Sequence, residues 1–142
     1  RLMKYYHETY HIPSWGYDIS PLSLGVTQKL KYDGRPYDFD ACDQALDLKD
    51  ASLIISYHML EHLSDPFNAV KKIYQEMNAG AYFHIEIPIE PGLPRLEFAH
   101  MFPFEPNDMG HMLAEAGFKM LFLSHQTHEG GPSVERYFVG KD

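Results

Sequence analysis

Two aspartates stand directly after apolar stretches, where their carboxylates could recognise a ligand. Asp18 follows an alternating aromatic stretch, and a carboxylate there can accept two hydrogen bonds from a vicinal diol. Asp40 is followed by the small Ala41, so it can accept a hydrogen bond from the exocyclic amine of a purine. Each acid also has a local interpretation. Asp18 can cap the helix that follows it, and Asp40 lies in an Asp-rich stretch.

A second group of polar residues follows the β-branched run of residues 53–56. His58, Glu61 and His62 match the H-x-x-E-H pattern, in which two histidines on one helical face bind zinc and the glutamate acts as a base. The chain contains nine histidines, and Pro66 leaves little room for a helix. A zinc-dependent peptidase is therefore the weaker hypothesis, and we assign no metal ligands from the sequence.

Tyr57 and His58 come directly after that same run, which is typical of a strand buried on both faces. Ligands of open parallel sheets bind beyond the C-terminal ends of the strands, so both side chains are candidates for a site. His100 lies in a Pro-rich aromatic stretch with Phe98, Phe102 and Phe104. That stretch could line a substrate pocket, or it could pack its aromatic side chains on one another.

Strand-like and helix-like stretches alternate along the chain, and this order predicts an α/β fold. Strands are predicted at residues 14–19, 37–41, 53–56, 82–88, 118–124 and 136–140, and helices at 1–11, 20–34, 64–80 and 106–116. Ser20-Pro21 and Asp65-Pro66 supply an N-cap followed by a proline, while Gly80 and Gly117 end helices. We expect an open, mostly parallel sheet with helices on both faces and an antiparallel C-terminal strand.

The composition excludes several classes of protein. The 142 residues carry a net charge of −8, which argues against nucleic acid or an anionic membrane as the main partner. Cys42 is the only cysteine and no apolar run approaches a membrane-spanning length, so a single cytoplasmic domain is expected. The oligomeric state stays open, with a homodimer as one alternative.

Four segments taken in order resemble one family. They are Gly16-Tyr17-Asp18-Ile19, Asp40-Ala41, residues 53–66 (LIISYHMLEHLSDP) and residues 78–88 (NAGAYFHIEIP). They are similar to the class I S-adenosylmethionine-dependent methyltransferases, in particular the small-molecule branch with an LEHLxDP segment. The stretch from His100 to Gly117-Phe118 resembles a later part of the same branch. The resemblance covers nearly the whole chain from about residue 14.

This resemblance implies a Rossmann-like fold, S-adenosylmethionine as cofactor with S-adenosylhomocysteine as product, and a small-molecule acceptor that the sequence does not identify. It implies cofactor-binding roles for Asp18 at the ribose, Ile19 and Asp40-Ala41 at the adenine, and Tyr57 and His58 beside the methionine part and the methyl group. Where the acceptor must lose a proton, His58 and His100 are the candidate catalytic bases.

One part of the family pattern has no match here. No segment before Asp18 resembles the family's first strand with its Gly-rich turn, and the chain begins with Arg1 instead of Met. Without that strand, two interior strands would expose unpaired backbone edges. We therefore expect one methyltransferase-like domain over residues 1–142 that is incomplete at its N-terminus, with the missing strand and turn encoded ahead of Arg1. A non-catalytic binding or scaffold module with the same fold is the alternative hypothesis.

Overall fold

The structure is a computed structural model that describes residues 2–41, 44–90, 100–127 and 133–142. The chain forms two compact units, Arg1–Asp43 and Gln44–Asp142, and each is considered by itself. Phe98, which the sequence analysis considered for a pocket, lies outside the described residues.

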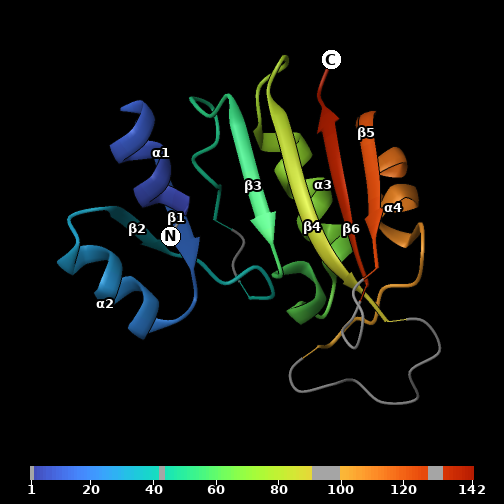
Figure 1. Ribbon diagram of the computed structural model, residues 1–142, viewed down its shortest axis with the longest axis horizontal. Coiled ribbons are helices and arrows are strands. Elements are labelled where there is room, and N and C mark those ends of the chain that lie inside the picture. The colour runs from blue at the N-terminus through green and yellow to red at the C-terminus, as the bar shows by residue number, and fades with distance from the viewer. Residues whose placement is uncertain (1, 42–43, 91–99, 128–132) are drawn as a thin grey trace. The chain divides into compact units, whose positions relative to one another are not determined.

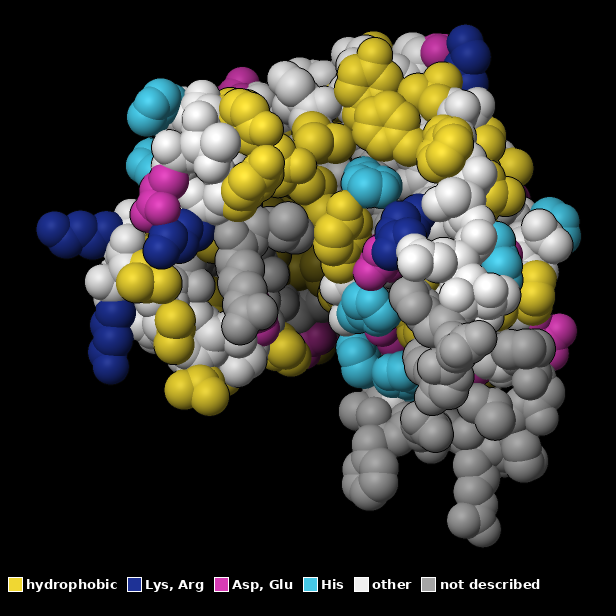
Figure 2. Space-filling model, viewed as in Figure 1, with side chains coloured by type: hydrophobic (Ala, Val, Ile, Leu, Met, Phe, Trp, Pro, Cys, Tyr) yellow, Lys and Arg dark blue, Asp and Glu magenta, His cyan; other side chains and the backbone are white. Residues whose placement is uncertain are grey.

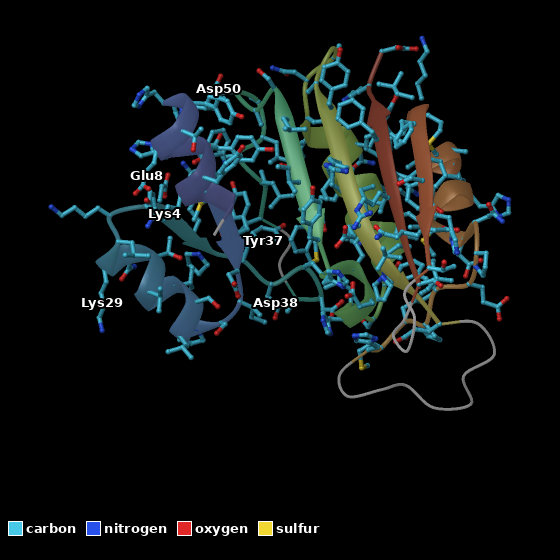
Figure 3. All side chains as sticks on the ribbon, in the orientation of Figure 1. Lys4, Glu8, Lys29, Tyr37, Asp38 and Asp50 are labelled. Atoms are coloured by element: carbon cyan, nitrogen blue, oxygen red, sulfur yellow. The ribbon has the colours of Figure 1, made fainter. Side chains whose placement is uncertain are left out.

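The first unit contains two helices and a two-stranded parallel sheet. Its elements are α1 (Leu2–Tyr10), β1 (Trp15–Asp18), α2 (Pro21–Lys29) and β2 (Asp33–Pro36). Ser20 caps α2, because its Oγ accepts a hydrogen bond from the backbone N–H of Ser23 at 3.4 Å, as the Ser20-Pro21 pair predicts. On α1, Lys4 and Glu8 lie one turn apart with their charged groups 3.8 Å from each other (Figure 3).

The prediction for the end of this unit is wrong in its boundaries. The expected strand at residues 37–41 is absent, and β2 instead occupies Asp33–Pro36, where a helix end was expected. Gly34 does not end the helix; it lies in β2 against Thr27 of α2, whose Cγ2 would be 2.8 Å from an added Cβ. The glycine therefore permits a close approach of helix and strand. Tyr37 and Asp38 follow β2 (Figure 3).

The second unit is a four-stranded sheet with the strand order β3-β4-β6-β5. Its elements are β3 (Leu53–Tyr57), the 3-10 helix η1 (Leu60–His62), α3 (Pro66–Glu76), β4 (Tyr82–Ile89), α4 (Asp108–Ala116), β5 (Lys119–Gln126) and β6 (Ser133–Gly140). Strand β6 is antiparallel to both of its neighbours, so β3, β4 and β5 run in one direction (Figure 1). The predicted α/β class, with a mostly parallel sheet and an antiparallel C-terminal strand, is confirmed.

Strand β4 separates the two faces of this sheet, because its side chains alternate between them. Phe83, Ile85 and Ile87 are buried on the face that α3 and α4 cover (Figure 1). The rings of Phe83 and Phe118 are 5.8 Å apart, and Phe118 contacts Tyr74 of α3 at 4.9 Å. His84 and Glu86 point to the other face, which consequently carries polar groups.

The prediction that β3 is buried on both faces is wrong. Leu53 is 40% exposed, and Ser56 is the one buried residue of the strand. Among the described strands β3 pairs only with β4, and β1 pairs only with β2, so each is an edge strand of its sheet. A β-branched run is found in edge strands as well as in central ones, so the composition of residues 53–56 does not determine how deeply the strand is buried. No helix in the described part of the chain is long and apolar enough to cross a membrane.

The helix end at Gly117 provides a test of this packing. Gly117 and Gly80 both have a left-handed backbone, with φ of 103° and 79°, so alanine at either position should cost about 1–2 kcal/mol. An added Cβ at Gly117 would lie 2.9 Å from the Tyr74 ring, whereas nothing lies within 4 Å at Gly80. We expect Gly117→Ala to lower the free energy of unfolding by a further ~1–3 kcal/mol relative to Gly80→Ala in urea titrations. Equal losses for both variants would contradict the Tyr74 contact.

Candidate functional site

The first candidate residues lie where β3 ends. Tyr57 is the last residue of β3 and pairs in register with Glu86 of β4. The backbone N–H of His58 donates to the carbonyl oxygen of Glu86 at 3.0 Å, and His58 has a left-handed backbone with φ of 49°. A side chain with a Cβ is uncommon in that conformation, and such residues gather at functional sites. The chain thus turns sharply at the residue that the sequence analysis singled out.

The His58 side chain is held by a polar network on the sheet face opposite the helices. Its Nε2 lies 2.9 Å from Oε1 of Glu86, and Arg136 of β6 donates from Nε to the other oxygen of the same carboxylate. Arg136 also donates from Nη1 to Gln126 of β5 at 2.7 Å. Glu86 therefore joins the end of β3 to the antiparallel pair, and it orients the imidazole of His58.

Tyr57 extends this network to a second histidine. Its Oη lies 2.9 Å from Nδ1 of His84, and the two rings meet edge to face. Burial lowers the pKa of His84 below its ordinary value of 6.5; Glu86 opposes this shift and Arg136 adds to it. His84 is thus held neutral between an aromatic hydroxyl and a charged pair.

A second cluster forms around η1, just beyond the same end of β3. Glu61 is only 1% exposed, and its Oε1 lies 3.4 Å from Nδ1 of His58 and 3.9 Å from Nε2 of His62. His100 joins this cluster, with its ring 4.9 Å from that of His62. The buried Glu90, directly after β4, lies 3.0 Å from Nδ1 of His100. Figure 2 shows histidine side chains gathered beside acidic ones on this face.

The arrangement departs from the H-x-x-E-H hypothesis. That hypothesis needs His58 and His62 on one helical face, but His58 precedes η1 with a left-handed backbone and lies in no helix. Among the described residues, the group with metal-binding spacing is Glu61, His62 and His100. The turn and the single 3-10 turn agree with the expectation that Pro66 leaves little room for a helix here.

The remaining sequence-predicted residues belong to the first unit. Asp18 ends β1 as predicted, and its Oδ1 accepts a hydrogen bond from the backbone N–H of Ser20 at 2.8 Å, whereas Ser20 is itself the N-cap of α2. Ile19 is 64% exposed. The prediction that Asp40 ends a strand is wrong, since Asp40 and Ala41 lie in a turn after β2. The Asp40 N–H donates to Oδ1 of Asp38 at 2.9 Å.

Sequence reasoning missed Glu86, Glu90, His84 and Arg136. Two of them carried a detectable signal, because His84 and Glu86 are the polar members of an alternating strand, and buried polar positions need partners. Glu90 lies beyond the end of that strand, and its pairing with His100 spans ten residues of chain. Arg136 reaches Glu86 across 50 residues, so only the sheet pairing reveals the contact.

Known proteins resemble this chain in structure only. The sequence matches no protein-family model and no curated protein. Among solved structures, the putative methyltransferase in complex with the Haloferax volcanii Trm112 methyltransferase activator superposes with a TM-score of 0.77 at 13% identity, over 99% of this chain and 77% of that one. The [4+2]-cyclase SpnF gives a TM-score of 0.72 at 12% identity, over 89% of this chain and 65% of that one.

A third similar structure is the magnesium protoporphyrin IX methyltransferase ChlM from Synechocystis PCC 6803 with bound S-adenosylhomocysteine. Its TM-score is 0.65 at 11% identity, over 90% of this chain and 64% of that one. The chain spans between 39% and 65% of the lengths of the first five similar structures. These similarities show that the chain has the Rossmann-like fold found in S-adenosylmethionine-dependent methyltransferases.

The lowered pKa of His84 predicts how stability depends on pH. The unfolded chain binds a proton at this histidine more readily than the folded chain, so its contribution to stability is lost as pH falls through about 6.5. We expect His84→Gln to lose less stability than the unmodified chain between pH 7.5 and 5.5 in urea titrations. His111→Gln, at an exposed helix position, is the control. An unchanged pH dependence in His84→Gln would show that His84 is not held neutral.

Proposed function

We propose that this chain binds S-adenosylmethionine and transfers its methyl group to a small-molecule acceptor. The observation that carries the proposal is positional. Asp18 and the Tyr57-His58 pair, which resemble methyltransferase positions, lie at the C-terminal ends of parallel strands. In open α/β sheets that is where ligands bind. The fold agrees with this assignment, because one of the similar structures is a methyltransferase with bound S-adenosylhomocysteine.

Residues of the first unit fit the nucleoside part of the cofactor. Asp18 engages Ser20 through Oδ1, and within the described residues Oδ2 has no donor, so that oxygen can accept from a ribose hydroxyl. Ile19 offers an exposed apolar side chain on which the adenine can pack. Asp40 and Ala41 are proposed for the adenine amine; their place in a turn, instead of at a strand end, makes this the weaker part of the assignment.

Residues of the second unit fit the methionine part of the cofactor and its reacting methyl group. When bound, S-adenosylmethionine supplies an electrophilic methyl group on its sulfonium sulfur, so the protein mainly orients the acceptor and excludes water. We assign Tyr57 and His58 to the methionine side and the acceptor. Glu86 fixes the imidazole of His58 by accepting Nε2–H, so Nδ1, beside Glu61, is the nitrogen that would take a proton from an acceptor hydroxyl or amine. Nδ1 of His100 faces Glu90 and donates its N–H to that carboxylate, which leaves Nε2 as the nitrogen that can accept a proton.

The fold by itself does not decide the reaction. SpnF, which has the same fold, is described as a [4+2]-cyclase, and a fold can support unrelated activities. The non-catalytic module therefore remains the second candidate, and binding without methyl transfer would favour it. The net charge of −8 disfavours polyanionic acceptors, which is consistent with a small-molecule acceptor. A cytoplasmic location stays a prediction.

A charge-removing variant of Asp18 tests the cofactor assignment. Asp18→Asn keeps a side-chain oxygen for the Ser20 N–H but removes the carboxylate, so we expect the affinity for S-adenosylhomocysteine to fall about ten-fold or more in calorimetry. The matched control is Asp65→Asn, because Asp65 caps α3 through the Asn68 N–H and loses the same charge. Unchanged affinity in Asp18→Asn would remove this residue from the site, and no binding by the unmodified chain would overturn the proposal.

A further inference from the structure

Glu61 presents a problem that the proposed function does not solve. It is the most deeply buried carboxylate of the described residues, at 1% exposure, and neither of its oxygens accepts a hydrogen bond there. An ionised carboxylate in such a place is costly unless a cation or several donors compensate it. The nearest cationic candidate, His58 at 3.4 Å from Oε1, is half exposed and leaves Oε2 without a bond. The buried carboxylate thus needs a positive partner.

Two imidazoles lie beside that carboxylate. One nitrogen of His62, one nitrogen of His100 and one oxygen of Glu61 all lie within 4.8 Å of one another. Ligands at zinc bond lengths of about 2.0–2.1 Å are separated by roughly 3.3–3.5 Å in a tetrahedral site. Side-chain rotations that shorten the distances between these three atoms by about 1–1.5 Å would bring them to tetrahedral separations. The half-exposed side chain of His62 has room for such a rotation.

The backbone holds these groups together although they come from distant parts of the sequence. The carbonyl oxygen of Glu61 accepts hydrogen bonds from the N–H groups of Met101 at 2.7 Å and Phe102 at 3.0 Å. Phe104 is fully buried, and its carbonyl accepts from the N–H of Glu90 at 2.9 Å. The segment that carries His100 is therefore fixed against both η1 and the end of β4. Such anchoring gives the preorganisation that a ligand set requires.

Glu90 supplies the interaction that commonly supports a metal-binding histidine. Its Oε1 lies 3.0 Å from Nδ1 of His100, and the carboxylate is nearly completely buried. A histidine that donates Nδ1–H to a carboxylate presents Nε2 as a ligand, with a fixed ring orientation and increased basicity. Two buried carboxylates around the site, Glu61 and Glu90, would together balance the charge of a dication.

We propose that Glu61, His62 and His100 form a binding site for a zinc-class divalent transition metal. Two imidazoles and one carboxylate suit zinc and similar ions, whereas magnesium and calcium prefer oxygen ligands. Three protein ligands leave a fourth position for water or for an oxygen or nitrogen atom of a bound molecule. The site differs from the H-x-x-E-H hypothesis, because Glu61 is a ligand and His100 replaces His58.

The metal site does not depend on the proposed cofactor binding. All of its residues lie in the second unit, and it changes one role: with His100 bound to metal, His58 remains the proton acceptor. The two proposals fail separately. Zinc is titrated in the absence of nucleoside, and Asp18→Asn should leave zinc binding unchanged.

Zinc titration of the chelator-treated 142-residue chain tests the site. We expect one zinc ion per chain by calorimetry and metal analysis, together with a rise in the thermal midpoint, because a ligand of the folded state stabilises it. His62→Ala, His100→Ala and Glu61→Gln should each weaken zinc binding about ten-fold or more. Should Glu61→Gln fail to fold by circular dichroism, the two histidine variants decide the result.

Two histidine controls make the outcome specific. His125 faces the buried Glu135 with Nδ1 3.4 Å from Oε1, much as His100 faces Glu90, but it belongs to no ligand group among the described residues. His125→Ala should bind zinc as the unmodified chain does, and so should His111→Ala, at an exposed helix position. No stoichiometric zinc in the unmodified chain, unaltered affinity in both His62→Ala and His100→Ala, or loss of binding in His111→Ala would overturn the proposal.

Discussion

The parallel pairing of β3 and β4 is the constraint on which the second unit depends. With Tyr57 in register with Glu86, both strands deliver the following chain to the same edge of the sheet, as parallel strands must. The turn at His58 and η1 follow the end of β3 at this edge, and Glu90 follows the end of β4. His58 and Glu86, which are 28 positions apart in the sequence, thereby become neighbours. If β4 shifted by one residue in this register, Glu86 would lie on the face that the helices cover. It would then no longer contact His58.

Three buried glutamates of this unit show how differently a fold can compensate a carboxylate. Glu135 accepts from the Tyr137 hydroxyl and from the N–H of Asn107, and this contact together with burial raises the pKa of Tyr137 well above its ordinary range. Glu90 faces His100. Glu61 alone lacks a hydrogen bond to its carboxylate among the described residues. Stability explains the first two arrangements, whereas the third is better explained by a ligand, since uncompensated burial reduces stability.

The methyltransferase proposal rests on the fold and its strand ends, whereas the proposed metal site rests on one cluster of side chains. The fold provides strand ends at which a nucleoside cofactor can bind, and it is shared with structures described both as methyltransferases and as a cyclase. The reaction must then be decided by the side chains at those ends. Here they are a histidine oriented by Glu86 and a carboxylate surrounded by imidazoles. A metal beside a cofactor site would add a second means of orienting an acceptor through the open coordination position.

Local sequence determined the elements. The capping residues Ser20 and Asp65, the left-handed Gly117 and the alternation of β4 each act within a few residues, so α2, α3, α4 and β4 were predictable. A prediction failed where tertiary packing overrode a local signal: Gly34 lies in a strand because α2 approaches it closely. The sequence by itself thus determined the α/β order, and it identified His58 and His100 as candidate site residues. Only the tertiary structure decided that Glu61, His62 and His100 meet, because strand register and long-range backbone hydrogen bonds leave no periodic trace in the sequence.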